Sequence, residues 1–261
     1  MQLTSKDTYV TALDMPRSLF SKIFLRPLFS FYPQVFLIVW RNSRKAVKGV
    51  YDGDDWADSS LEILRTLENV GVRFEITGLD NLKSFEGPAV FIANHMSTLE
   101  TFVLPCIIQP VKPATFVVKK SLVSTPVFGP IMRSRDPIVV GRINPREDLK
   151  AVLNEGAKKI EQGISIFIFP QSTRSAVFNP EEFNSLGIKL ALKAGVPVVP
   201  VALKTDAWGT GKLIKDFGPV DKNKKVFFAF GEPMKIKDRG DEEHQKVIDF
   251  IQNNLAKWSA Q

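Results

Sequence analysis

The residues best suited to acid–base chemistry are His95 and Glu100, which flank the segment Met96-Ser97-Thr98-Leu99. His95 is one of only two histidines in the chain. A carboxylate beside a histidine can bind one ring nitrogen, fix the tautomer and stabilise the imidazolium that forms when the other nitrogen takes a proton. The pair alone is a weak signal, because any histidine with an acidic residue at this spacing fits the pattern. His95 is therefore a candidate general base that needs support from other residues.

Two arginines that follow apolar runs supply such support. Arg142 comes directly after the run 137–141, and Arg174 lies in the segment 170–175 that follows the run 166–169. An arginine at the end of a strand can hold a phosphate through two parallel hydrogen bonds. For either arginine alone, a surface ion pair is the more common arrangement. Two of them, together with a histidine and a carboxylate, indicate a site for a phosphorylated substrate.

Short apolar runs alternate with helical patterns from about residue 51, which predicts a continuous α/β domain over residues 51–261. Near-continuous apolar strands indicate a mostly parallel sheet that helices cover on both faces. The carboxyl ends of such strands form the edge where sites gather, and His95 follows one of them. The expected strands are 73–77, 89–93, 114–118, 137–140, 165–169, 196–203 and 225–230, and the expected helices are 54–70, 98–108, 145–162, 181–194 and 241–258.

Residues 1–50 predict a membrane-associated helical segment. A spanning helix needs about 20 mostly apolar residues, but the apolar stretch 19–40 contains two basic residues and two prolines. It also lacks the clean apolar core and cleavage site of a signal peptide. Aromatic residues with flanking cations suit the interface of an anionic bilayer, while a helix pair packed on the protein's own core is the alternative. The apolar positions at helical spacing are Phe20, Ile23, Phe24 and Leu28, and the cations are Arg17, Lys22, Arg26, Arg41, Arg44, Lys45 and Lys48.

The overall charge and the cysteine count narrow the function classes further. A net charge of +7 and an isoelectric point near 9.4 favour anionic partners, among them nucleic acid, membrane surfaces and phosphorylated substrates. Nucleic acid is not expected, because outside the N-terminal segment no basic stripe alternates with aromatic residues. The single cysteine, Cys106, excludes an intramolecular disulfide and lies in an apolar run that suits a buried side chain. No metal site is expected.

Four blocks in order give the chain a resemblance to the glycerolipid acyltransferases. The branch that it resembles most is the lysophosphatidate (1-acylglycerol-3-phosphate) acyltransferases. This resemblance implies a seven-stranded sheet flanked by helices and a membrane-associated N-terminal helical element. It also implies acyl transfer from an acyl-thioester, either acyl-CoA or acyl-carrier protein, to a lysophospholipid hydroxyl, giving phosphatidate. The blocks are His95-x-x-x-x-Glu100, Gly141-Arg142, Phe169–Ser175 and Val196–Val201, and they lie within about residues 75–235.

The mechanism expected from these residues is general-base catalysis. His95 would take the proton of the acceptor hydroxyl while Glu100 orients the ring, and backbone N–H groups near the start of the next helix would hold the oxyanion. No cofactor is expected beyond the acyl-thioester co-substrate. The location expected is the membrane surface, as a monotopic or peripheral protein that faces the cytoplasm. The substrate-binding residues expected are Arg142, Gln171, Ser172, Thr173, Arg174 and Ser175.

Three positions depart from the family pattern, which has His, four further residues and Asp in the first block and Phe-Pro-Glu-Gly-Thr-Arg-Ser in the third. Glu100 keeps the charge of the Asp and adds a methylene. Gln171 replaces the Glu and removes a charge, and Ser172 replaces the Gly. These changes leave two alternatives open: an acyltransferase that uses a different lysolipid acceptor, and a non-catalytic membrane-surface protein that binds lysophospholipid.

Overall fold

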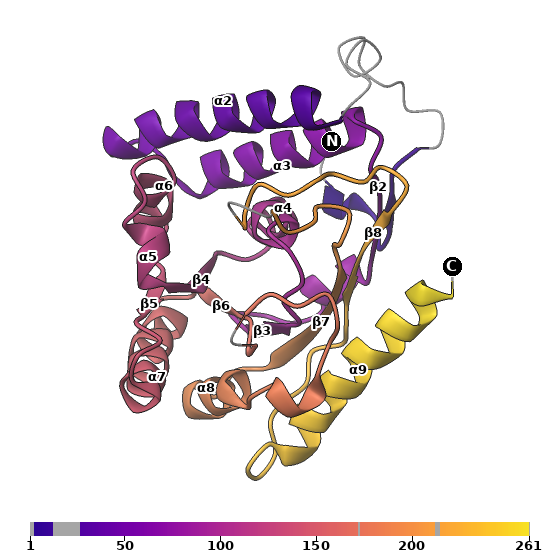
Figure 1. The fold of residues 1–261 in the computed structure, drawn as a ribbon. Helices are drawn as coiled ribbons and strands as arrows, with labels where there is room; N and C mark the ends of the chain where they lie inside the picture. The colour runs from indigo at the N-terminus through magenta and orange to yellow at the C-terminus, as the bar shows by residue number, and fades with distance from the viewer. Residues whose placement is uncertain (1–2, 13–26, 172, 212–214, 261) are drawn as a thin grey trace.

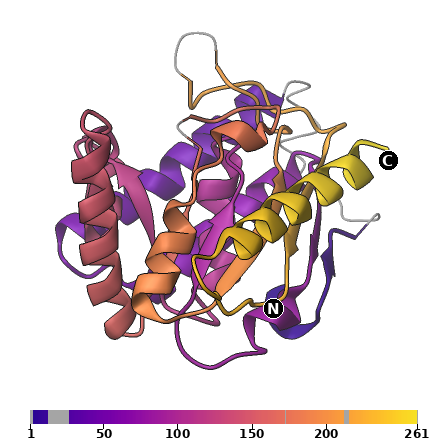
Figure 2. The same ribbon diagram turned by 90° about the horizontal axis from the view of Figure 1, so that it is seen from below.

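The structure is a computed structural model that describes residues 3–12, 27–171, 173–211 and 215–260 (Figure 1). One sheet lies between two layers of helices. Seen from below in Figure 2, the helices over residues 145–161, 186–194 and 241–259 lie in front of the sheet. On one face lie α2 (Pro27–Val47), α3 (Gly53–Asn69) and α4 (Leu99–Ile108), and on the other lie α7 (Pro145–Glu161), α8 (Leu186–Ala194) and α9 (Asp241–Ser259). Two short helices, α5 (Lys120–Val123) and α6 (Gly129–Ser134), precede the strand β5 (Ile138–Val140).

The described residues form an eight-stranded sheet in the order β1-β2-β8-β7-β3-β6-β4-β5. The five strands from β7 to β5 run parallel, whereas β8 is antiparallel to β7 and β1 is antiparallel to β2. The strands are β1 (Tyr9–Val10), β2 (Arg73–Thr77), β3 (Val90–Ala93), β4 (Ala114–Lys119), β5 (Ile138–Val140), β6 (Ser165–Ile168), β7 (Val198–Lys204) and β8 (Lys225–Phe230).

The prediction of a mostly parallel, seven-stranded sheet is therefore wrong in two respects. The sheet is mixed, because the described chain passes from β7 to β8 without a crossover helix and so returns along its neighbour. An additional strand, β1, pairs with the edge strand β2. Each of the seven apolar runs does form a strand, and all the expected α/β alternation is present.

Capping residues explain where the longer helices begin. Asp52 caps α3 by accepting a hydrogen bond from the N–H of Asp55 at 2.9 Å. Asn144 caps α7 by accepting from the N–H of Arg146 at 3.1 Å, and Pro145 occupies the first turn. Such caps satisfy backbone donors that the helix itself leaves unpaired. Gly195 ends α8 in the left-handed region with φ of 68°, a conformation that costs glycine little.

The N-terminal segment is described only in part. Leu19, Phe20, Ile23 and Phe24 lie outside the described residues, as do the expected cations Arg17, Lys22 and Arg26. Residues 9–10, within the segment expected to be helical, form the strand β1. The boundary at residue 50 stays a prediction.

Helix α2 has two different sides. Phe31, Val35 and Ile38 point into the core, where they join the cluster on that face of the sheet. Phe36, Leu37 and Trp40 are 61%, 58% and 43% exposed. Among the described residues, no helix combines the length and the apolar character that crossing a membrane requires. The helix thus packs on the protein's core and also presents large apolar side chains outward.

Candidate active site

The candidate base lies in the turn that joins β3 to α4. Strand β3 ends at Ala93 and α4 begins at Leu99, so His95 sits beyond the carboxyl end of a central strand. Asn94 fastens this turn to β7, because its side chain donates to the carbonyl of Leu203 at 2.8 Å and accepts from the N–H of Leu203 at 2.8 Å. The turn is therefore held at a fixed position on the sheet edge.

Glu100 and His95 form the pair that the spacing predicts. Nδ1 of His95 lies 2.9 Å from Oε1 of Glu100, with the two side chains 15% and 0% exposed. The carboxylate also accepts the N–H groups of Met96 and Ser97, at 2.7 and 2.8 Å. The hydroxyl of Thr205 donates to Oε2 at 2.5 Å. These donors hold the carboxylate both from the turn and from the residue that follows β7.

The surroundings of Glu100 keep it charged. Burial alone would raise the pKa of Glu100, but the hydrogen bond and charge of His95, followed by Thr205 and the backbone of Ser97, lower it overall. Glu100 also lies in the first turn of α4, where the helix dipole favours an anion. A carboxylate at Nδ1 places the proton of a neutral ring on that nitrogen, so Nε2 becomes the proton acceptor.

Three backbone donors near the start of α4 already have partners within the turn. The N–H groups of Met96 and Ser97 bond Glu100, and the N–H of Leu99 bonds the Ser97 hydroxyl oxygen at 3.1 Å. These three N–H groups are engaged within the turn, and oxyanion binding by donors near the start of α4 stays a prediction. Their hydrogen bonds go to the Glu100 carboxylate and the Ser97 hydroxyl oxygen.

The segment that follows β6 wraps around His95 at three points. The ring of Phe169 stacks on the imidazole, with centroids 4.3 Å apart and planes inclined by 24°. The side-chain oxygen of Gln171 accepts from the N–H of His95 at 2.6 Å. The N–H of Ser175 donates to the carbonyl of His95 at 2.9 Å. The third sequence block thus positions both the backbone and the ring of His95.

These contacts bear on four of the expected substrate-binding residues. Gln171 is buried and bonds the backbone, which a neutral amide can do as well as a carboxylate. Ser172 lies outside the described residues, and Thr173 is exposed. The hydroxyl of Ser175 donates to the carbonyl of Val177 at 2.7 Å in a local turn. Substrate binding by these side chains stays a prediction.

Arg174 lies beside the turn that holds His95. Its guanidinium donates to the hydroxyl oxygen of Thr98, the residue before α4. Nη1 also lies 2.6 Å from Oδ1 of Asp216, which comes from the connection between β7 and β8. The structure therefore brings Arg174 and the His95–Glu100 pair together at one sheet edge.

Arg142 lies on the same edge but farther along it. Strands β6 and β4 separate β3 from β5, so the strand axes are about 15 Å apart at ordinary strand spacing. The N–H groups of Gly141 and Arg142 donate to the carboxylate of Asp148, each at 2.8 Å. The backbone of Arg142, which makes one of these two hydrogen bonds, lies in the left-handed region with φ of 58°. A role for Arg142 in phosphate binding stays a prediction.

Sequence reasoning missed Thr205, Phe169 and Asp216 as site residues. Thr205 directly follows β7, so the strand-end argument used for His95 would have found it. Phe169 lies in the third block, but nothing in its type or position indicates a contact with the His95 ring. Asp216 lies in a connection without any regular pattern, and nothing local points to its contact with Arg174.

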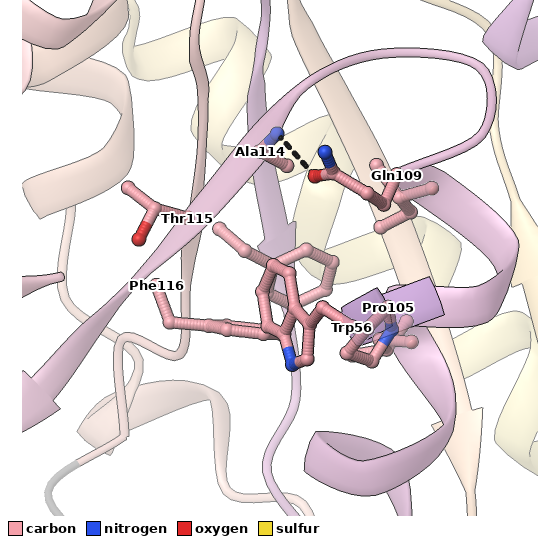
Figure 3. A pocket seen from close by; sticks show the side chains of 9 residues that line it. Trp56, Pro105, Gln109, Ala114, Thr115 and Phe116 are labelled. Atoms are coloured by element: carbon pink, nitrogen blue, oxygen red, sulfur yellow. Dashed lines mark hydrogen bonds between the residues drawn. The ribbon is translucent and has the colours of Figure 1, made fainter. Parts of the chain in front are cut away.

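Aromatic contacts run from His95 through Phe169 and Phe116 to Trp56, and the last two line a small cavity with Pro105, as the close view in Figure 3 shows for Trp56, Phe116 and Pro105. Phe169 stacks with Phe116 at 6.2 Å between centroids, and Phe116 meets Trp56 edge-on at 5.6 Å. The cavity, of about 10 Å³, is lined by apolar groups that include Trp56, Phe116 and Pro105. This is room for about one water molecule.

Cys106 is buried, as expected. Burial raises the pKa of its thiol to about 12, so it is not a thiolate nucleophile at neutral pH.

Residues 73–204, which contain all of the strand-end motifs, match the sequence model of the Acyltransferase family. The chain belongs to this family. It is 33% identical over 148 residues to a 1-acyl-sn-glycerol-3-phosphate acyltransferase of Pseudomonas aeruginosa, covering 57% of this chain and 55% of that protein. It is 31% identical over 138 residues to the enzyme of that name from Escherichia coli, covering 52% and 54%. The chain thus spans about half the length of these curated relatives.

The fold of this acyltransferase chain is also similar to a solved structure. The crystal structure of the 1-acyl-sn-glycerophosphate (LPA) acyltransferase PlsC from Thermotoga maritima superimposes with a TM-score of 0.65. The two share 20% sequence identity, and the alignment covers 92% of this chain and 98% of the other. The likeness establishes the α/β architecture, with its mixed sheet flanked by helices.

Proposed function

We propose that this chain is a 1-acylglycerol-3-phosphate acyltransferase, which acylates the free hydroxyl of lysophosphatidate to give phosphatidate. The observation that carries the proposal is the buried Glu100 carboxylate at Nδ1 of His95, with Arg174 bonded to Thr98 of the same turn. A base and a phosphate-binding cation then lie at one sheet edge. The names of the relatives from Pseudomonas aeruginosa and Escherichia coli support this choice of acceptor.

In the proposed reaction, Nε2 of His95 takes the proton of the acceptor hydroxyl as its oxygen attacks the thioester carbonyl carbon. A C–O bond forms and the carbonyl becomes a tetrahedral oxyanion. The oxyanion then collapses, the C–S bond breaks, and the imidazolium returns its proton to the departing thiolate. Glu100 stabilises the imidazolium in between. Arg174 holds the acceptor phosphate, which brings the hydroxyl to Nε2 and converts binding energy into rate.

The donor in this proposal is a water-soluble acyl-thioester, either acyl-CoA or acyl-carrier protein, and no bound cofactor is needed. Lys119 and Lys120 are both exposed at the carboxyl end of β4, on the same sheet edge as His95. Their charges suit the anionic part of either donor.

The proposed partner for α2 is an anionic phospholipid surface. Phe36, Leu37 and Trp40 supply exposed apolar groups. Arg44, whose guanidinium lies 4.9 Å from the Trp40 ring centroid, and Lys48 add positive charge at the same end of the helix. Aromatic and basic residues of this kind suit a helix that lies on the cytoplasmic leaflet without crossing it.

The experiment assays acyl transfer by the purified protein from each of two donors, acyl-CoA and acyl-carrier protein, to each of several lysolipid acceptors. The His95→Ala variant is the control. We expect phosphatidate from lysophosphatidate and a loss of at least about a thousandfold in His95→Ala. If the protein acylates another lysolipid but not lysophosphatidate, the result would favour the alternative of a different acceptor. Binding of lysophospholipid without any acyl transfer would favour the non-catalytic alternative.

A further inference from the structure

The guanidinium of Arg174, proposed to hold the acceptor phosphate, already pairs with a carboxylate of the same chain. Oδ1 of Asp216 lies 2.6 Å from Nη1 of Arg174. The hydroxyl of Thr98 donates to the same oxygen at 3.1 Å. One carboxylate oxygen thus takes a guanidinium and a hydroxyl donor together, which is also how a protein binds a phosphate oxygen. Asp216 stands where a phosphate oxygen would have to bind.

Asp216 is presented by a segment that packs on the protein. Its neighbour Phe217 lies against the ring of Tyr32 on α2, with centroids 5.3 Å apart. The hydroxyl of Tyr32 donates to the carbonyl of Gly218 at 2.5 Å. The N–H of Gly209 donates to the carbonyl of Pro219 at 2.9 Å. These contacts hold the carboxylate at Arg174 from two sides.

We propose that Asp216 is a built-in competitor of the acceptor phosphate. The proposal rests on the proposed function, in which Arg174 binds that phosphate. In the free protein the Asp216 carboxylate occupies Arg174 and Thr98, and an acceptor must displace it to bind. A phosphate monoester carries more charge and more acceptor oxygens than a carboxylate, so it can displace the Asp216 carboxylate from Arg174 and Thr98.

The competition sets the acceptor concentration at which the enzyme works. The ion pair between Asp216 and Arg174 must separate before the acceptor phosphate can bind. The apparent affinity for the acceptor is therefore reduced by the fraction of molecules in which the pair is already separated. Asp216 is exposed, and exposed ion pairs are weak, so the expected effect is about fivefold. A neutral lysolipid has no group that can displace the carboxylate, so Asp216 also selects for anionic head groups.

The test compares Asp216→Asn with a matched control, Asp221→Asn, which removes the same charge from the same connection. Asp221 accepts from the N–H of Asn223 at 3.0 Å, away from Arg174. We expect Asp216→Asn to lower the KM for lysophosphatidate about fivefold, with kcat within twofold of wild type. Asp221→Asn should leave both constants unchanged.

A second readout does not depend on turnover. Inorganic phosphate is titrated while the melting temperature is followed in the wild type, Asp216→Asn and Arg174→Ala. We expect half of the thermal shift at about fivefold lower phosphate in Asp216→Asn, and no shift in Arg174→Ala. Unchanged phosphate binding in Asp216→Asn, or a raised KM, would overturn the competitor role. Enhanced phosphate binding without any lysophosphatidate turnover would refute the proposed function and leave the competitor role standing.

Discussion

The side-chain oxygen of Gln171 accepts the backbone N–H of His95 at 2.6 Å, which joins the segment after β6 to the turn after β3. An amide and a carboxylate can both accept this hydrogen bond, so the charge that the family has at this position is not needed for it. The departure at Gln171 therefore concerns the positioning of the base more directly than the head group of the acceptor.

For Gln171→Ala we expect kcat to fall about tenfold with the acceptor KM within twofold, because the His95 backbone loses its buried acceptor. Gln171→Glu keeps an acceptor and should stay within about threefold of wild type. Steady-state kinetics with the acceptor varied measures both constants. A large change in KM with kcat preserved would instead show that Gln171 contacts the head group.

For Glu100→Gln we expect kcat to fall about 10²- to 10⁴-fold, because the imidazolium loses its charged partner and the ring its fixed tautomer. The substitution keeps the size of the side chain, and circular dichroism should show an unchanged fold. The KM values should change little, since Glu100 is fully buried behind His95. Near-normal turnover in a folded Glu100→Gln protein would rule out the pair as the catalytic unit.

The lowered pKa of Glu100 predicts a dependence of stability on acid. In the unfolded chain the carboxyl has its ordinary pKa of 4.5, and in the folded chain the pKa is lower. Its contribution to the free energy of unfolding is therefore complete above about pH 4.5 and is lost as the pH falls through the folded value. Urea unfolding at several pH values should show the gap between wild type and Glu100→Gln shrinking below pH 4.5. A gap that stays constant would contradict the assignment.

For Arg174→Ala we expect the KM for lysophosphatidate to rise at least about tenfold, because a charge-assisted phosphate contact is lost. The donor KM should change little. Arg174→Lys keeps the charge but not the paired hydrogen-bond geometry, so its KM for lysophosphatidate should lie between those of the wild type and Arg174→Ala. An equal rise in both KM values would show that Arg174 maintains the site as a whole.

For Leu37→Glu we expect binding to anionic vesicles to weaken about tenfold, because an exposed apolar contact on α2 is replaced by a charge. The matched control is Leu192→Glu on α8, on the other face of the sheet, where the leucine is 44% exposed. Vesicle co-sedimentation measures the binding, and melting temperatures check the fold. Equal losses in both variants would show that α2 is not the contacting surface.

Local patterns identified most of the elements but not how they pair. The runs that became strands are apolar and bounded by turns, so each could be recognised within a few residues. The direction of β8 depends on the connection from β7, and no run encodes it. Strand β1 is two residues long and is defined only by its pairing with β2. Register and direction are properties of contacts between distant segments.

The candidate site divides in the same way. The spacing of His95 and Glu100 is local, and the structure joins them as expected. Gln171 accepts the backbone N–H of His95, and Asp216 pairs with Arg174. Both contacts depend on which groups meet after folding. The type and position of a residue in the sequence do not say which of several donors it will reach.

The paired hydrogen bonds between Asn94 and Leu203 make the alignment of the proton acceptor a property of strand register. A slip of β7 by one residue would turn its side chains to the opposite face of the sheet. Both hydrogen bonds would break, and Thr205 would leave the Glu100 carboxylate. Strands β3 and β7 are buried at the centre of the sheet, so contacts that open only with the fold as a whole hold His95 in place, and activity should persist on heating until the protein unfolds.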